Sequence, residues 1–190
     1  MSDRFRGNPG SLDTGYLTEL GLLRHAPKDT GGSEPQRWPV DVYLEDCVLG
    51  GVVESMQRRL GDHLRAVDDL LQLEGAVVRS LKTGADLTKP RSAIVTTHNI
   101  LFVVDCSEVP AEDRHNGLHV EKRTHLVTAN VGPYWARGRA HLPPAGDMHN
   151  YIRGASGSFI PLTEVTISGH EQHNGKTMLL NRAHLRCLLL

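Results

Sequence analysis

The chain contains few cysteines, no excess of charge and no long apolar run. Its 190 residues include only three cysteines, Cys47, Cys106 and Cys187, and none of them forms a Cys-x-x-Cys pair. An odd number of cysteines does not suit a closed disulfide framework, so we expect three reduced thiols and a cytoplasmic protein. No apolar stretch reaches the roughly 18 residues of a membrane-spanning helix. No apolar segment follows Met1 as in a signal peptide, and we therefore expect no membrane insertion.

The charges nearly cancel. The sequence has 21 Lys and Arg against 22 Asp and Glu, which gives a formal net charge of −1. This balance removes the simplest argument for nucleic-acid binding, a strongly basic surface. It leaves room for a local basic patch.

Motifs for nucleophilic catalysis and for phosphate binding are missing as well. There is no Gly-x-Ser-x-Gly elbow. No Lys follows the short Gly154–Ser158 segment, as it would in a phosphate-binding loop. Cys106 ends a predicted strand without basic neighbours in sequence that would lower the pKa of its thiol. These absences predict a protein that is not an enzyme and that binds no cofactor.

The sequence does contain a β-rich pattern that occurs twice. The first copy runs from about Val40 to Val104 and the second from about Thr124 to Leu189. The shift between the copies is about 88 residues, with small gaps later in the alignment. Aligned pairs include Gly50 with Gly138, Arg65 with Arg153, Leu73 with Leu162, and Val104 with Leu188.

Each copy shows the same order of local patterns. Val40, Val42 and Leu44 alternate with polar residues, which predicts a half-buried strand. The consecutive apolar residues 100–104 predict a strand that is buried on both faces. Leu60 and Leu64 have the spacing of one helical turn. We therefore predict a mainly β fold of two tandem five-stranded barrels or sandwiches, each with one short helical turn.

The domain boundaries follow from composition. Residues 1–38 hold six Gly and three Pro and predict a flexible N-terminal arm. The first β module spans residues 39–106, a connector spans 107–123, and the second module spans 124–190. A module of about 65 residues is marginal on its own, so we expect the two copies to pack together. The sequence leaves open whether they form separate barrels or one continuous sheet.

Two segments carry a resemblance to known proteins. The phrase from Val131 to Pro144 and the Arg59-Leu-x-Asp-x-Leu64 segment resemble small β modules of the SH3 or Sm type in bacterial proteins of unknown function. The resemblance covers about three quarters of the chain. It implies a small bent barrel in each copy and brings no active site with it.

The arm contains one apolar island that suggests a function. Such a segment either covers its own domain or anchors on a partner. We therefore hypothesise a non-enzymatic accessory or scaffold protein that binds a partner protein or self-assembles through the arm. The island consists of Tyr16, Leu17, Leu20, Leu22 and Leu23.

Two alternative sites remain. Arg137 and Arg139 lie on one face of a predicted strand close to Trp135, as in a nucleic-acid or nucleotide-binding surface, although charge-balanced surface pairs would explain the same residues.

His170 and His173 are three residues apart near a predicted hairpin tip. They would hold a metal in a metal-dependent enzyme only with further ligands. The alternative is that both histidines are ordinary exposed residues of a loop without a functional role.

Overall fold

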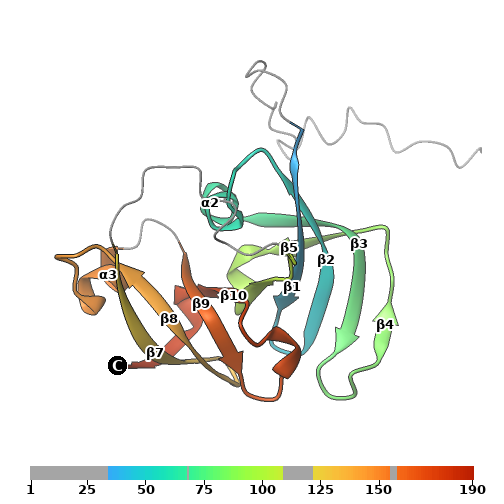
Figure 1. The fold of residues 1–190 in the computed structure, drawn as a ribbon. Helices are drawn as coiled ribbons and strands as arrows, with labels where there is room; N and C mark the ends of the chain where they lie inside the picture. The colour runs from blue at the N-terminus through green and yellow to red at the C-terminus, as the bar shows by residue number, and fades with distance from the viewer. Residues whose placement is uncertain (1–33, 68, 109–121, 155–157) are drawn as a thin grey trace, which may run out of the picture. The chain divides into compact units, whose positions relative to one another are not determined.

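The computed structural model describes residues 34–67, 69–108, 122–154 and 158–190, which are coloured in Figure 1. The fold is mainly β, as the sequence predicts, with two short α-helices, α2 (Leu60–Ala66) and α3 (Met148–Gly154). The apolar island of the arm lies outside the described residues. Within these ranges, no helix is long and apolar enough to cross a membrane.

Strands cover both segments that the sequence predicts as strands, residues 40–44 and 100–104, although β1 ends at Tyr43 and β6 begins at Phe102. The first half contains β1 (Gln36–Tyr43), β2 (Cys47–Ser55), β3 (Leu70–Ser80), β4 (Asp86–Thr88), β5 (Ser92–Thr96) and β6 (Phe102–Asp105). The second half contains β7 (Arg123–Val131), β8 (Tyr134–Leu142), β9 (Phe159–Ile167), β10 (Thr177–Asn181) and β11 (Leu185–Leu189). Single 3-10 turns are η1 (Thr97–Asn99), η3 (Glu171–His173) and η4 (Arg182–His184). The short strand β4 lies in a segment that the sequence predicts as a loop.

All described strands belong to one antiparallel sheet of 11 strands. Its order is β11-β7-β8-β9-β10-β6-β1-β2-β3-β4, and β5 also pairs with β3. The two halves meet where β10 pairs with β6, with Leu179 opposite Val103 and Leu180 opposite Phe102. We call this β6·β10 pairing the internal seam. The sequence left open whether the halves share a sheet, and the structure joins them into one.

The third strand of each half has a bend with left-handed backbone. Gly75 in β3 has φ 57° and Glu164 in β9 has φ 51°. A β-bulge lets a strand curl, and the left-handed conformation suits glycine better than glutamate. The sequence predicts an edge or bulge at Pro161. β9 is not an edge strand, because it pairs with both β8 and β10, but Pro161 itself pairs only with Leu179 of β10, and the register of β9 with β8 shifts between Thr163 and Thr166.

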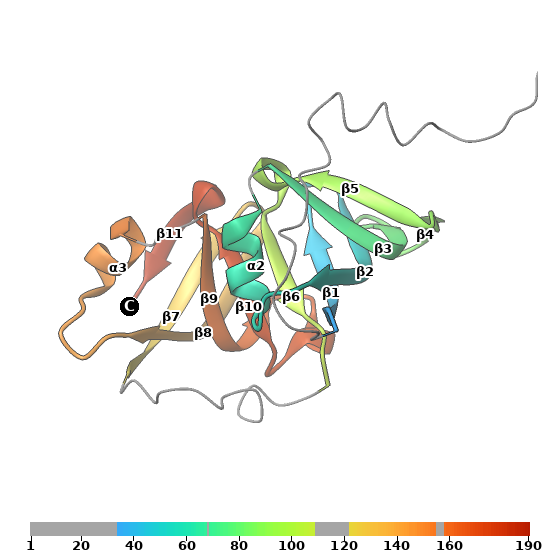
Figure 2. The same ribbon diagram turned by 90° about the horizontal axis from the view of Figure 1, so that it is seen from above.

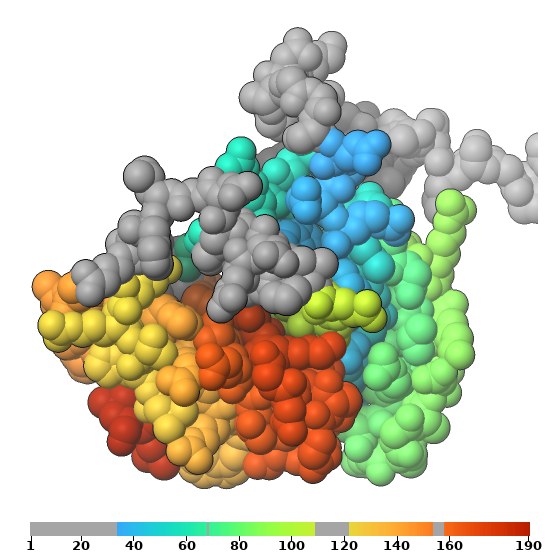
Figure 3. All heavy atoms as spheres, viewed as in Figure 1, coloured from blue at the N-terminus to red at the C-terminus, as the bar shows by residue number. Residues whose placement is uncertain are grey.

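Two apolar cores lie on the sheet, and each takes residues from both halves. The first core is built around first-half residues such as Val42, Leu49, Leu71, Leu73 and Val95, and it includes Phe159 and Leu179 of the second half. The second core is built around Ala129, Ala136, Leu162, Met178 and Leu180, and it includes Tyr43, Val48, Phe102 and Val104 of the first half. In Figure 3 the yellow-to-red atoms of the second half lie directly against those of the first.

This exchange explains the unbroken apolar run of β6. Val103 belongs to the first core, whereas Phe102 and Val104 belong to the second. Both faces of the strand are therefore buried, and neither face can carry polar residues. Helix α2 supports the same junction, because Leu60 and Leu64 lie in the first core and the helix contacts β9, as Figure 2 shows.

Candidate functional site

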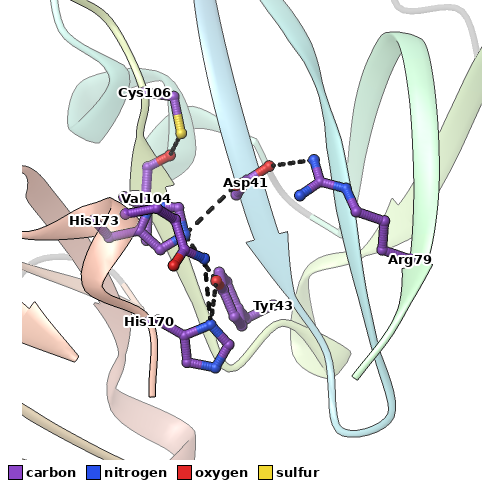
Figure 4. Close-up of polar contacts among 8 residues, drawn as sticks. Asp41, Tyr43, Arg79, Val104, Cys106, His170 and His173 are labelled. Carbon is purple, nitrogen blue, oxygen red and sulfur yellow. Dashed lines mark hydrogen bonds and ion pairs between the residues drawn. The ribbon is translucent and has the colours of Figure 1, made fainter. Parts of the chain in front are cut away.

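A cluster of polar side chains lies beside the internal seam. Asp41 comes from β1, Cys106 follows β6, and His173 ends η3 in the second half. One potential ligand atom from each of these residues lies within 4.8 Å of the other two. Figure 4 shows Asp41 between Arg79 and His173. The cluster therefore needs both halves of the chain, and the β1–β6 and β9–β10 segments position it together.

Tyr43 connects the two histidines. Its hydroxyl group lies 2.7 Å from Nε2 of His173 and 3.1 Å from Nδ1 of His170. A hydroxyl group has one proton, so it donates to one ring and accepts a hydrogen bond from the other. Asp41 Oδ2 lies 3.5 Å from His173 Nε2, and Arg79 donates to Asp41 Oδ1 at 3.3 Å.

Burial keeps this cluster neutral apart from the Asp41–Arg79 pair. Desolvation lowers the pKa of His173 against the opposing effect of Asp41, and it also lowers the pKa of His170. Desolvation raises the pKa of Tyr43 far above its ordinary value. Burial, followed by the charge of Asp41, raises the pKa of Cys106 to about 11. A thiol with such a pKa is almost fully protonated at neutral pH and is a poor nucleophile.

The cluster has one polar atom that the described residues leave unsatisfied. His173 is 1% exposed, and its Nδ1 has no hydrogen-bond partner among them. Carboxylate, thiolate and imidazole are the ligand types of zinc sites. The bond from Arg79 to Asp41 works against a metal ion, because it places a cation on one of the three ligands.

The sequence finds only part of this cluster. It singles out His170 and His173, and the structure places both against Tyr43 but places only His173 with Asp41 and Cys106. The interpretation of both as exposed loop residues is wrong for His173, which is buried. The sequence does not predict Asp41 and Cys106 as neighbours of His173. No pattern near either residue indicates that β1, β6 and η3 come together in the fold.

The sheet also has two open ends. Among the described residues, β5 pairs only with β3, and β11 pairs only with β7. Exposed large apolar side chains gather there. The first open end is formed by β4 and β5, with exposed Leu87 and Ile94. The second open end is formed by β11, with exposed Leu189 and Leu190, and we include in it the exposed Trp135 of β8, which lies two strands in from that edge. An apolar sheet edge of this kind favours pairing with another strand.

The predicted nucleic-acid residues lie on the outer face of β8. Trp135, Arg137 and Arg139 alternate with buried residues and are all exposed. Arg139 makes an ion pair of 2.6 Å with Glu164 on β9. One of the two arginines therefore faces a carboxylate, and Trp135 belongs to the second open end. Nucleic-acid binding stays a prediction.

Comparison with known proteins gives no relative. No family model, no curated protein and no solved structure matches the chain. The functional inference therefore depends on the geometry of this chain alone.

Proposed function

We propose that this protein is a non-enzymatic scaffold in which two copies of one β module form a continuous sheet, and that the open ends of this sheet bind protein strands. The pairing order supports the repeat. The first half has the order β5-β3-β2-β1-β6, and the second half has the order β10-β9-β8-β7-β11. The same connections therefore produce the same arrangement twice.

Two glycines support the repeat in detail. A Cβ atom added to Gly51 would meet the backbone oxygen of Glu74 and the Cβ of Leu73. A Cβ atom added to Gly138 would meet the equivalent atoms of Thr163 and Leu162. Gly51 therefore corresponds to Gly138, one residue away from the Gly50 that the sequence alignment selects. Both glycines allow two strands to approach closely.

The observation that carries the proposal is the gathering of exposed apolar side chains at unpaired sheet edges. Ile94 is 68% exposed and Leu189 is 54% exposed. Each lies on a strand with one free edge among the described residues. An extended partner strand would satisfy the backbone groups of such an edge and cover its apolar side chains, which is how β-strand addition recognises proteins.

Charge substitutions at the two ends test this function. We expect Ile94→Asp and Leu189→Asp each to remove a protein that co-purifies in fixed stoichiometry with the wild-type chain. Met56→Asp is the matched control, because Met56 is 61% exposed and lies outside both open ends. Loss of the complex with the control, or its persistence in both edge variants, would contradict the proposal.

A second candidate function is a metal site at the polar cluster. Two observations favour it: potential ligand atoms of Asp41, Cys106 and His173 lie within 4.8 Å of one another, and the buried Nδ1 of His173 has no hydrogen-bond partner among the described residues. Titration with Co²⁺ would then give one equivalent of binding and an ultraviolet thiolate-to-cobalt absorption that Cys106→Ser abolishes. A wild-type spectrum that does not change on adding Co²⁺ would remove this candidate.

A further inference from the structure

We infer that the partner at each open end is a second copy of this chain. Building on the function proposed above, β11 of one molecule pairs with β5 of the next in the register that β6 and β10 use inside the chain. The reason is that the two open strands are the repeats of the two strands that form the internal seam. Each position can be identified from the strand pairing alone.

Strand β5 occupies the place of β10. Val95 lies opposite Leu71 in β3 and faces the first core, just as Leu180 lies opposite Ile160 in β9 and faces the second core. The next residue towards the N-terminus is Ile94 in β5 and Leu179 in β10. Ile94 therefore corresponds to Leu179.

Strand β11 occupies the place of β6. Val103 lies opposite Val42 in β1, and Leu188 lies opposite Ala129 in β7. Val42 and Ala129 are themselves equivalent, because they pair with Leu49 and Ala136 two residues before the matched glycines. Leu188 therefore corresponds to Val103, Leu189 to Val104 and Cys187 to Phe102.

Equivalent positions differ greatly in exposure. Leu179 is 3% exposed at the internal seam, whereas Ile94 is 68% exposed; Val104 is 0% exposed, whereas Leu189 is 54% exposed. Trp135 follows the same rule, because its equivalent Val48 is buried in the second core. Ile94, Leu189 and Trp135 are therefore the exposed counterparts of apolar residues that are buried around the internal seam.

The residue pairs of the internal seam predict the residue pairs of the contact between two molecules. At the internal seam, Leu179 faces Val103 and enters the first core, while Val104 faces Met178 and enters the second core. Between molecules, Ile94 would face Leu188 and enter the second core of the neighbour. Leu189 would face Ala93 and reach the first core of the other molecule, and Val95 would face Cys187.

The two surfaces of this interface are different, so the contact is heterologous. Each molecule keeps one free edge after a dimer forms, and further copies add head to tail until a ring closes or a filament grows. An unrelated protein strand would meet only one open end. A second copy fits better, because one chain carries both complementary surfaces.

Mixing two blocked variants tests this arrangement on the purified full-length chain. We expect the wild type and Met56→Asp to form larger assemblies in analytical ultracentrifugation, with Ile94→Asp and Leu189→Asp each monomeric. A 1:1 mixture of the two blocked variants retains one intact pair of ends and should form a heterodimer. An interface between two identical edges would give no such heterodimer.

An oxidative cross-link tests the register and does not depend on the aspartate variants. Val95→Cys should form a disulfide with the native Cys187 of a neighbouring molecule, because directly opposed residues on antiparallel strands lie within disulfide reach. Ile94→Cys is the control, since its side chain points to the other face of the strand. Adding Cys187→Ser to Val95→Cys should abolish the covalent dimer.

Three results would overturn the inference: a wild-type chain that stays monomeric at high concentration, a mixture that gives only monomers, or equal cross-linking of the Val95→Cys and Ile94→Cys variants. The proposed scaffold function would survive the first of these results if another protein were still lost from the Ile94→Asp and Leu189→Asp variants. Retention of that protein by both edge variants would reject the scaffold function as well.

Discussion

The internal seam and the open ends use equivalent strands but differ in their polar residues. At the seam, Asp41 and Tyr43 bond with His173, and Asn181 donates its side-chain amide to the backbone oxygens of Thr97 and Ile100. The corresponding residues at the open ends are Thr128, Asn130 and Thr96, which provide no carboxylate and no phenol. Backbone pairing and apolar burial would hold the open ends, whereas side-chain polar bonds and the covalent chain also hold the seam. In the assembly that we infer, one strand arrangement would serve both as a permanent joint and as a reversible one.

The strongest way to break this comparison is to truncate equivalent residues. We expect Leu179→Ala to lower the free energy of unfolding by about 2–5 kcal/mol, because it leaves a cavity in the first core. Ile94→Ala should change the stability of the dilute monomer by less than about 0.5 kcal/mol, because the side chain is exposed. Urea denaturation of both variants measures the difference. Equal losses of stability would contradict the view that Leu179 is buried at the seam while Ile94 is exposed at the open end.

The polar part of the seam can be removed separately. Tyr43→Phe deletes the hydroxyl group that both histidines contact, and we expect a loss of about 1–3 kcal/mol because the buried Nε2 of His173 loses its hydrogen-bond partner at 2.7 Å. Tyr134→Phe is the matched control, since its ring packs against Tyr43 and Phe102 and its hydroxyl group has no hydrogen-bond partner among the described residues. Denaturant midpoints of the two variants give the comparison. A control as damaged as Tyr43→Phe would assign the effect to ring packing.

Acid should weaken the seam. The pKa of His173 is lowered in the folded chain by burial, so the unfolded chain, with a histidine pKa of about 6.5, binds a proton that the folded chain refuses. Above about pH 6.5 His173 is unprotonated in both states and does not change the free energy of unfolding. As the pH falls below that value, the unfolded chain gains a proton and the free energy of unfolding decreases. Urea midpoints between about pH 7.5 and pH 5 should show a shallower fall for His173→Gln. An unchanged slope would rule out His173 as the source.

The smallest expected effect concerns the bend in the third strands. Glu164 and Gly75 both have left-handed backbone, which favours Gly over Ala by about 1–2 kcal/mol. Glu164→Gly should therefore be more stable than Glu164→Ala by about the amount that Gly75→Ala loses. Comparing Gly with Ala at residue 164 cancels the loss of the Arg139 ion pair. Thermal unfolding measures the Gly-to-Ala difference at residue 75 and at residue 164. A clear difference at one of these positions and none at the other would show that only one half requires the bend.

Local patterns were sufficient to predict most of the fold. The helical spacing of Leu60 and Leu64 and the apolar run of β6 depend on neighbours in sequence, and both predictions are confirmed. The alternation in β1 predicts the strand correctly, but the expected half-burial is wrong, because Asp41 and Tyr43 on the other face are also buried. The continuous sheet was not predictable, because the pairing of β6 with β10 joins distant segments. The run Phe102–Val104 contained the clue, since a strand buried on both faces requires a second core.

The candidate sites were less accessible to sequence reasoning for the same reason. The open ends appear only when it is known which strands have a free edge, and Ile94 and Leu189 look like ordinary strand residues until then. The one-residue error in the alignment of Gly50 had a similar origin. Gly50 and Gly51 are adjacent, and only the contacts with β3 show which of them allows close approach.

The exchange of residues between the cores has a consequence during synthesis. Phe102 and Val104 emerge from the ribosome about 75 residues before β10, and at about 5–20 residues per second that interval lasts about 4–15 seconds. Until β10 arrives, the outward face of β6 has no second core to enter. The nascent first half therefore leaves the apolar face of Phe102 and Val104 uncovered for several seconds.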